Sequence, residues 1–479
     1  MPKSLIEPSE SSTSEQKREL LRQLLAESEP EEKEYRLAYA QRGIWFMEQL
    51  QPGSGVYKLA LGLRLTGDLN VPVLERALTR VVEHQSALRT VFMTGADSEP
   101  RQRVLPAEDQ RIPVVDLTGI PDESRESKAQ RIAWLEARAP FDLLNGPLLR
   151  VRLLKLREAE HILLFTMHHI ISDGTSMGLF ADELAAFYEQ ELNGTPGEAP
   201  ETPIEYGEYA EWQLTAFESD HLQAQIDFWR KRLAGAPQLL ELPSDRPRLR
   251  DQSLTAGSIS DPLPPDLMKA VRAACQREGV TVFSFLLASF VTLLHRYSGA
   301  EDLCVAVPVA GRKQVEVENV IGLFASMQVA RIDLSGNPRF RDVVSRVQSA
   351  LLDCEENQDV PFEVLVEKLQ PQRSMAYHPL VQVMATGLQK NLKTGRFGPV
   401  SATPYPVSNG ASQFDLASFF TEGAGAEYTW QTDFSTALFD ESRIERMRGH
   451  FERMAFAAAA NPEQQIGGLP CLPPRKRNS

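Results

Sequence analysis

Most of the chain alternates between segments with helical apolar spacing and short apolar segments typical of β-strands. In the first half, the helical pattern of residues 71–85 leads into a strand-like segment at 87–93. Two further strand patterns, at 147–156 and 161–169, are followed by a helical pattern at 176–192. Strands and helices that alternate in this way bury their apolar faces against each other in layers. We therefore predict an α/β fold in which helices cover mixed sheets.

The second half repeats the theme. Its patterns predict helices at 264–279, 281–299, 338–357 and 441–460, and strands at 303–311, 326–334, 379–389 and 428–434. Between the halves, the Gly- and Pro-containing segment 193–204 is the strongest loop signal in the chain. We therefore expect an N-terminal part at 35–205 and a C-terminal part at 206–470, each of about 200 residues, and a tail at 471–479.

Residues 1–34 differ from the rest, because they are rich in Ser, Glu and Pro. Within them, residues 14–27 form one amphipathic stretch that begins after a capping-box pair, Thr13 and Gln16. An isolated helix of this length is marginal in water unless it packs on something. Two interpretations stay open: a helix that packs on its own domain, or a docking element for another polypeptide.

The charge balance limits the partners. The chain has 51 Lys and Arg against 65 Asp and Glu, a net charge of −14. Such an acidic chain is a poor candidate for binding nucleic acid or an anionic membrane through its overall field. The N-terminus is polar, without an apolar signal core, and no apolar stretch is long enough to span a bilayer. Four cysteines lie far apart without metal-ligand spacing, so we predict free thiols and a cytoplasmic protein.

One polar cluster stands out. The strand pattern at 161–169 ends in His168 and His169, and Asp173 and Gly174 follow just before the next helix. Adjacent residues on a strand point to opposite faces, so one histidine is expected to face a cleft while the other packs internally. Asp173 could accept the Nδ1–H of His169 or act as a structural anchor. The Gly174 amide lies near a helix N-terminus, where negative charge is favoured.

Three interpretations compete for this cluster. A metal site would need further ligands, and the sequence contains no HExxH, CxxC or second histidine pair. A purely structural histidine pair is the second. The third is a general base or hydrogen-bonding catalyst that acts without a covalent nucleophile, and no Walker loop or GxGxxG motif accompanies it.

Residues 167–176, MHHIISDGTS, resemble the HHxxxDG signature of the condensation domains of nonribosomal peptide synthetases, within the chloramphenicol acetyltransferase-like superfamily. Further family-like segments follow in the family's order and extend the resemblance over roughly residues 35–470: YAQRGIWFMEQL (39–50), HQSALRTVF (84–92), AVPVAGR (306–312), IGLFASMQVAR (321–331), NQDVPFE (357–363) and QFDL (413–416). The resemblance implies two acetyltransferase-like lobes arranged as a V around a central active-site tunnel.

The resemblance also implies residue roles. His169 would be the catalytic residue, either as a base or by orienting the amine and stabilising the tetrahedral intermediate, within a motif completed by His168, Asp173 and Gly174. Asp173 would shape the loop through a salt bridge, with Arg312 the first candidate partner and Arg89 the second. The substrate tunnel would be lined by Thr175, Ser176, Ser326 and Gln328. Ser326 stands in place of an asparagine usual in the family, and Thr175 stands where a bulkier residue is frequent.

As an acyltransferase of this family, the protein would join an acceptor α-amine to a donor thioester. Donor and acceptor carrier proteins would deliver both substrates on phosphopantetheine arms, and the domain would bind no cofactor or metal of its own. Residues 1–34 would receive the donor from an upstream synthetase, and a monomer is expected.

Four alternatives compete with this activity. Heterocyclisation domains carry DxxxxD where this chain keeps both histidines, which disfavours the first alternative. Segments 321–331 and 357–363 resemble condensation rather than epimerisation motifs, which disfavours the second. An ester-forming or free-acceptor enzyme, and a degenerate domain that only docks carriers or tailoring enzymes, stay open.

Overall fold

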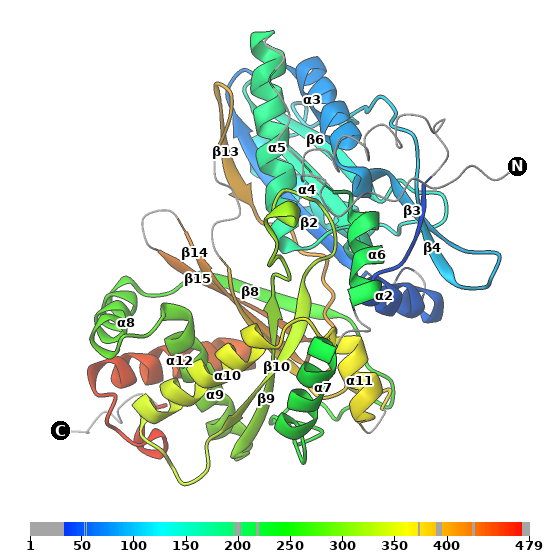
Figure 1. Ribbon diagram of the computed structural model, residues 1–479. Helices are drawn as coiled ribbons and strands as arrows, with labels where there is room; N and C mark the ends of the chain where they lie inside the picture. Colours follow the sequence, from blue (N-terminus) through cyan, green and yellow to red (C-terminus); the bar gives the residue numbers. More distant parts are fainter. Residues whose placement is uncertain are drawn as a thin grey trace, which may run out of the picture.

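Two α/β lobes lie one above the other in the computed structural model (Figure 1), and each contains a six-stranded sheet with helices packed on it. The structure describes residues 33–471, apart from 52, 54, 195–196, 198–201, 203, 217–219, 372–373, 389–394 and 424–426. The predicted amphipathic segment at 14–27, like all of residues 1–32, lies outside the described residues, as do residues 472–479 of the predicted tail.

The first lobe is built from the N-terminal half. Its elements are β1 (Glu34–Arg36), α2 (Tyr39–Leu50), β2 (Lys58–Thr66), α3 (Val71–His84), β3 (Thr90–Thr94), β4 (Pro100–Val104), β5 (Val114–Asp116), α4 (Asp122–Arg138), β6 (Leu149–Arg157), β7 (Glu160–His168), α5 (Gly174–Asn193) and α6 (Tyr206–Ala216). Two strands from later in the chain, β12 (Arg396–Phe397) and β13 (Val400–Tyr405), complete its large sheet in the order β12-β13-β2-β7-β6-β5. The strands β1-β4-β3 form a smaller second sheet.

Strand β7 lies between β2 and β6 inside the large sheet, and helices cover both of its faces. Ile162 and Leu164 belong to the apolar cluster beneath α4, whereas Leu163 and Phe165 belong to the cluster shared with α3 and α5. Burial on both faces explains why the strand reads as a continuous apolar run rather than an alternating one. The strand therefore holds the residue at its end, His168, firmly at one edge of the first lobe.

The second lobe repeats this construction with a different strand order. Its elements are α7 (Asp220–Arg232), β8 (Ala256–Pro262), α8 (Pro265–Glu278), α9 (Val282–Ser298), β9 (Asp302–Val309), β10 (Ser326–Asp333), α10 (Phe340–Glu356), α11 (Phe362–Leu369), β11 (Val383–Leu388), β14 (Leu416–Glu422), β15 (Tyr428–Ser435) and α12 (Glu441–Ala460). The sheet order is β10-β9-β11-β14-β15-β8, and β11 runs parallel to both β9 and β14.

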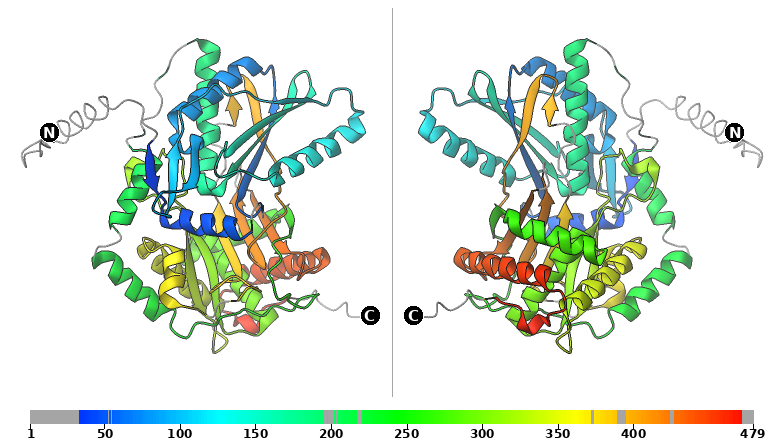
Figure 2. Two further views of the ribbon diagram at one scale, coloured as in Figure 1. Left: turned by 90° about the vertical axis from the view of Figure 1, so that its right-hand side faces the viewer. Right: turned by 90° about the vertical axis from the view of Figure 1, so that its left-hand side faces the viewer.

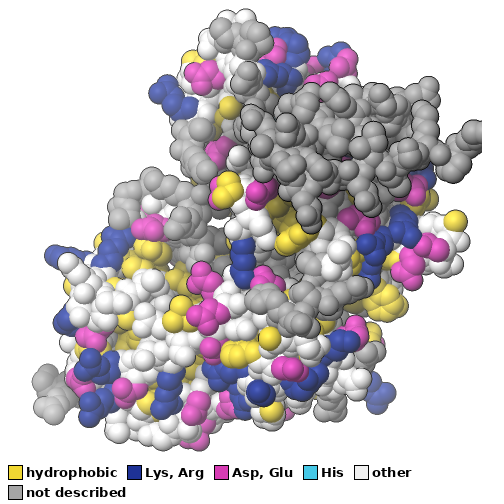
Figure 3. Space-filling view, viewed as in Figure 1, with side chains coloured by type: hydrophobic (Ala, Val, Ile, Leu, Met, Phe, Trp, Pro, Cys, Tyr) yellow, Lys and Arg dark blue, Asp and Glu magenta, His cyan; other side chains and the backbone are white. Residues whose placement is uncertain are grey.

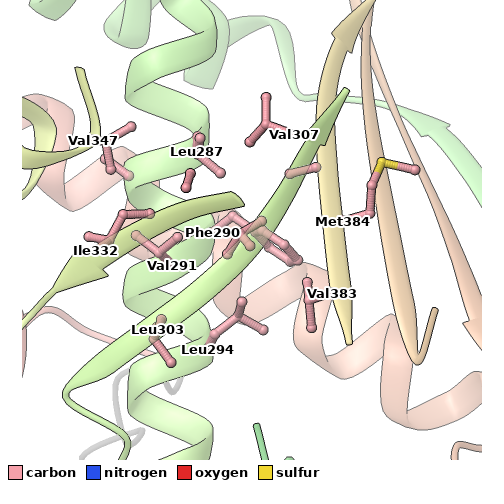
Figure 4. Close-up of a cluster of buried hydrophobic side chains, with 14 of the residues drawn as sticks. Leu287, Phe290, Val291, Leu294, Leu303, Val307, Ile332, Val347, Val383 and Met384 are labelled. Atoms are coloured by element: carbon pink, nitrogen blue, oxygen red, sulfur yellow. The ribbon is translucent and has the colours of Figure 1, made fainter. Parts of the chain in front are cut away.

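Helix α9 is the centre of the second lobe's core. The Thr281 hydroxyl caps its first turn by accepting from the Ser284 N–H at 3.1 Å, and Gly299 ends it in a left-handed conformation. Between these ends the helix is apolar on every side, which is typical of a helix buried all round. In Figure 4, Phe290 and Leu294 point toward β9 and β11, and Val347 of α10 lies on the other side of the helix.

The chain returns from the second half into the first lobe, so the predicted division at residues 205 and 206 is incomplete. Strand β13 pairs antiparallel with β2 from Ser401 opposite Thr66 to Tyr405 opposite Gly62. The segment from Val317 to Phe324 also contributes side chains to the first lobe's core cluster. A loop signal marks a boundary along the chain only, whereas the free edge of β2 needs hydrogen-bond partners and takes them from a distant strand.

None of the described helices is by itself both long and apolar enough to cross a bilayer; α8 and α9 meet the criterion only as a pair, bent by 109° at the break between them. Within the described ranges, no three His, Cys, Asp or Glu side chains are grouped so as to hold a metal ion. Acidic and basic side chains are interspersed over the face shown in Figure 3.

Candidate active site

His169 lies where the chain leaves β7 as a short 3₁₀ helix, η2 (His169–Ile171). Its backbone N–H donates to the Tyr57 carbonyl at 2.8 Å, which extends the ladder between β2 and β7 by one bond. Its ring Nδ1 lies 2.8 Å from the Ser172 carbonyl oxygen. Because a carbonyl oxygen only accepts, Nδ1 carries a proton, and in the neutral ring Nε2 therefore has the free lone pair. The side chain is partly exposed, so a substrate group can reach this lone pair.

His168 is held in the opposite tautomer. Its Nδ1 accepts from the Ile170 N–H at 3.2 Å, so its proton is on Nε2, which lies 3.5 Å from Glu48 Oε1. The Phe141 ring packs edge-on against it, with the ring centroids 5.9 Å apart. Burial lowers the pKa of His168 and favours the neutral ring. As expected, one histidine is accessible and the other is internal, although the end of the strand separates them rather than strand alternation.

Asp173 anchors the motif to the second half of the chain. Its Oδ1 accepts from the Ser176 N–H at 2.8 Å and caps α5, while its Oδ2 accepts from the amides of Phe324 and Ala325, each at 3.0 Å. Of the two roles left open by the sequence, this geometry fits the anchor. The imidazole Nδ1–H goes to the Ser172 carbonyl instead of the Asp173 carboxylate.

Arg312 is the cation that faces Asp173, with Nη2 3.4 Å from Oδ1 and both side chains buried. Its Nη2 also donates to the Ser176 hydroxyl at 2.8 Å, and its Nη1 donates to the carbonyl oxygens of Val317 and Val320, each at 2.7 Å. The guanidinium therefore ties the 317–320 segment to the motif.

Arg89, the second candidate partner of Asp173, is not used in that way. Its Nη1 donates to the Leu105 carbonyl at 2.6 Å. The Leu105 N–H in turn donates to the Arg89 carbonyl at 2.9 Å, so the two residues are backbone neighbours beside the small sheet. The sequence could not separate the two arginines, because neither lies near Asp173 along the chain.

Gly174 and Thr175 form the exposed first turn of α5. The first amides of a helix have no acceptor within it, and Asp173 accepts only that of Ser176, so those of Gly174 and Thr175 lack a partner inside the helix. A Cβ added at Gly174 would meet nothing within 4 Å. An anion or a developing negative charge is therefore favoured in the open space beside this turn.

Two of the four predicted tunnel residues do not lie on an accessible wall. Ser176 and Gln328 are both 0% exposed. The Ser176 hydroxyl donates to the Gly322 carbonyl at 2.8 Å, and Gln328 Nε2 donates to the Val360 carbonyl at 3.1 Å, so both hold backbone together. Thr175 is exposed and Ser326 is partly exposed, and for these two the tunnel role stays a prediction.

Sequence reasoning missed several groups that hold the two histidines in place. Tyr57 and Ser172 act through backbone carbonyls, which leave no signal in side-chain identity. Glu48 had a signal: it lies seven residues after Gln41 on the buried face of α2, where a polar side chain needs a partner. Gln41 Nε2 donates to the Ile170 carbonyl at 3.0 Å, so α2 is bonded directly to the motif.

This geometry can be compared with known proteins. A family model described as the condensation domain matches residues 31–479. The chain belongs to the condensation-domain family. A linear gramicidin synthase polypeptide of Brevibacillus parabrevis is 37% identical over 446 residues, which are 92% of this chain and 6% of that polypeptide. This condensation domain therefore spans only a small part of the length of the synthetase it matches.

Solved structures agree with the family. The X-domain from teicoplanin biosynthesis, solved in complex with OxyB, gives a TM-score of 0.80 at 28% identity and covers 93% of this chain and 97% of that chain. The first condensation domain of the calcium-dependent antibiotic synthetase gives a TM-score of 0.79 at 21% identity, with 92% of this chain and 99% of that chain covered. The predicted family and two-lobe α/β fold are thus confirmed: this is a condensation domain of the nonribosomal peptide synthetase type.

Proposed function

We propose that this condensation domain forms an amide bond between two carrier-bound substrates. The α-amine of an aminoacyl group on the acceptor carrier attacks the thioester carbonyl of an acyl or peptidyl group on the donor carrier. The C–S bond breaks, the thiol of the donor's phosphopantetheine arm leaves, and the lengthened chain stays on the acceptor. The carriers supply both arms, and the domain supplies the side chains that align the reacting groups.

The tautomer of His169 is the observation that carries this proposal. With Nδ1–H bonded to the Ser172 carbonyl, Nε2 of the neutral ring is an acceptor, so the ring can receive a hydrogen from an attacking amine. The amides of Gly174 and Thr175, which have no acceptor within α5, favour the negative charge that develops on the thioester oxygen. Both groups come from one continuous strand–turn–helix segment, so their relative positions are fixed.

A test uses an acceptor carrier loaded with aminoacyl-pantetheine, a donor carrier loaded with an acyl group, and this protein. Intact-protein mass spectrometry of the acceptor carrier is expected to show a mass gain equal to the acyl group. His169→Ala is expected to lower the rate by about 10²–10⁴-fold, the usual contribution of a positioned acid–base group.

A second histidine offers a matched control. His295 in α9 makes the same kind of bond, with Nδ1 2.8 Å from the Ala300 carbonyl oxygen, but it lies in the other lobe. His295→Ala is expected to retain transfer. If His169→Ala transferred the acyl group as fast as wild type, the proposed role of His169 would be wrong.

A second candidate function is docking without catalysis. It is favoured by the likeness to the X-domain, which was solved in complex with OxyB. Failure of the wild-type protein to transfer any acyl group between carriers that it binds would support this candidate. Release of the product free in solution would instead support a free-acceptor or ester-forming enzyme.

A further inference from the structure

A carboxyl group from the second lobe lies against α2 of the first lobe, the helix that also contacts η2 of the catalytic motif. Glu363 is the second residue of α11, and α11 packs beneath α2 where the two lobes meet (Figures 1 and 2). A Cβ added at Gly43 of α2 would come within 2.9 Å of Glu363 Cγ and 3.2 Å of its Oε1. The absence of a side chain at Gly43 therefore leaves the space that the Glu363 side chain occupies.

Nothing in the described part of the chain neutralises this carboxyl. No hydrogen bond or ion pair joins Glu363 to another described side chain. Lys313 Nζ lies 2.8 Å from Asp359, Lys368 Nζ lies 3.1 Å from Glu367, and Arg42, which precedes Gly43 on α2, donates from Nε to the Leu37 carbonyl at 3.1 Å. Burial raises the pKa of Glu363 to about 7, opposed only by its own backbone amide. The side chain nevertheless keeps part of its surface accessible, so a group from outside can reach it.

Tyr57 connects Glu363 with the catalytic motif. The Tyr57 carbonyl accepts from the His169 N–H at 2.8 Å. Burial raises the pKa of the Tyr57 hydroxyl, and the charges of Glu363 and Glu48 raise it further, so Glu363 lies within electrostatic reach of Tyr57. A partly accessible Glu363 without a counter-ion among the described side chains, packed against a helix that contacts η2, is arranged to receive a cation.

The position of Glu363 is set by buried bonds rather than by a loose loop. Gln328 of β10 donates to the carbonyl oxygens of Gln358 and Val360, at 3.3 and 3.1 Å, directly before α11 begins. Gln225 of α7 holds Asp359 in the same segment, with Nε2 2.8 Å from Oδ2. These bonds fix the first turn of α11, and with it the Glu363 side chain.

We infer that Glu363 binds the α-ammonium group of the carrier-bound acceptor and holds it on the α2–α11 side of His169. This inference rests on the proposed function, because it gives the acceptor amine its place. An α-amino group has an ordinary pKa of about 7.7–8.0, so much of it arrives as a cation at neutral pH. A carboxylate in a partly dry site binds such a cation with a charge-assisted hydrogen bond.

Binding of two amide-linked pantetheine analogues to the full chain tests this inference. In both, NH replaces the thioester sulfur, and one carries a glycyl group while the other carries an acetyl group that lacks the amine. Calorimetry at pH 7.5 is expected to show that wild type binds the glycyl analogue about tenfold more tightly than the acetyl analogue. Glu363→Gln is expected to abolish that preference while leaving the affinity for the acetyl analogue unchanged.

Two further variants sharpen the test. Glu367→Gln removes a carboxyl one turn later on the same helix, where it is exposed, and is expected to keep the preference. Gly43→Ala leaves Glu363 in the sequence but places a methyl group where its side chain lies, and is expected to reduce the preference. Unchanged far-ultraviolet circular dichroism verifies that each variant is folded.

The outcomes separate this inference from the proposed function. If wild type condenses carrier-bound substrates but Glu363→Gln keeps both the amine preference and the wild-type acceptor KM, the inference is wrong and the proposed function stands. If wild type prefers the glycyl analogue through Glu363 but transfers no acyl group, the binding role stands and the proposed function is wrong.

Discussion

At the scale of single residues, two neighbouring histidines acquire different chemistry from one difference in what their Nδ1 atoms contact. Nδ1 of His169 faces a carbonyl oxygen, while Nδ1 of His168 faces the N–H of Ile170. One ring must therefore donate at Nδ1 and the other must accept there, which leaves opposite groups at the two Nε2 atoms. Only His169 then offers a lone pair to the accessible side of the motif.

Substitution of the two histidines should separate activity from stability. His169→Ala is expected to lose activity with little change in the free energy of unfolding, because the side chain is partly exposed and has one local bond. His168→Ala is expected to cost about 2–4 kcal/mol, because it empties a buried site beside Phe141. Urea unfolding followed by fluorescence measures both. Equal destabilisation by the two variants would contradict this assignment.

Loss of the Asp173 carboxylate is expected to lower the stability of the whole protein, because Asp173 also binds groups from the second half of the chain. Asp173→Ala leaves the guanidinium of Arg312 buried and the amides of Phe324 and Ala325 without an acceptor. Removal of one partner from a buried pair costs about 3–5 kcal/mol. We expect a lower melting temperature for Asp173→Ala, and a double variant with Arg312→Met that is more stable than the single one. Additive effects of the two substitutions would indicate that the pair is not coupled.

The ionised carboxylate of Glu363 is expected to destabilise the folded protein in mild alkali. Its pKa is raised from 4.5 to about 7 by burial, so the folded state binds a proton that the unfolded state has released between these pH values. The free energy of unfolding is therefore expected to fall as the pH rises from about 4.5 to 7. At pH 8, Glu363→Gln should be more stable than wild type by about 1–3 kcal/mol. Denaturant unfolding at pH 5 and pH 8 checks this, and an unchanged difference between the two proteins would contradict it.

At the scale of elements, α11 and the turn before β14 are packed together through one histidine. The His378 ring lies 5.3 Å from the ring centroid of Phe362 on α11 and 5.2 Å from that of Phe414. Its Nδ1 donates to the Pro379 carbonyl at 3.1 Å. A neutral ring suits this aromatic setting, and burial lowers the pKa of His378 to about 4.

This packing predicts a loss of stability in mild acid. Because the folded pKa of His378 is about 4 and its ordinary value is 6.5, the unfolded state binds the proton first as the pH falls. The free energy of unfolding should therefore drop by about 1–3 kcal/mol between pH 6.5 and 4. His378→Asn should flatten this part of the stability–pH curve, as measured by chemical denaturation. A curve identical to that of wild type would mean that another group causes the loss.

At the scale of the whole molecule, the two lobes are bound together by chain segments that cross between them. Strand β13 adds to the sheet of the first lobe, and residues 317–324 are held there by Arg312 and Asp173. Gln85 adds a further link, since it accepts from the Ile321 N–H and donates to the Asn319 carbonyl, both at 2.9 Å. Neither lobe can therefore unfold without breaking the other's contacts.

These crossings predict that heat or denaturant unfolds both lobes in one transition. Tryptophan fluorescence and circular dichroism should give coincident curves, because the sheet and core of the first lobe are incomplete without β12, β13 and residues 317–324, which the second half of the chain supplies. Gln85→Ala, which leaves buried polar groups of both halves unpaired, should lower the stability of the whole by about 1–3 kcal/mol without splitting the transition. Two separate transitions would contradict this description.

Much of the fold and the centre of the site follow from local sequence. Strongly apolar segments such as α9 and β7 lie where their patterns predict them, because an element that is buried all round has a continuous apolar sequence. His168, His169, Asp173 and Gly174 are recognisable because they are contiguous on one strand–turn–helix segment. Only the tertiary structure decided that Arg312 rather than Arg89 pairs with Asp173, that Ser176 and Gln328 are interior, and that β13 joins the first lobe. Those outcomes depend on contacts between residues far apart in the chain and on the exclusion of water around them, and a local sequence pattern determines neither.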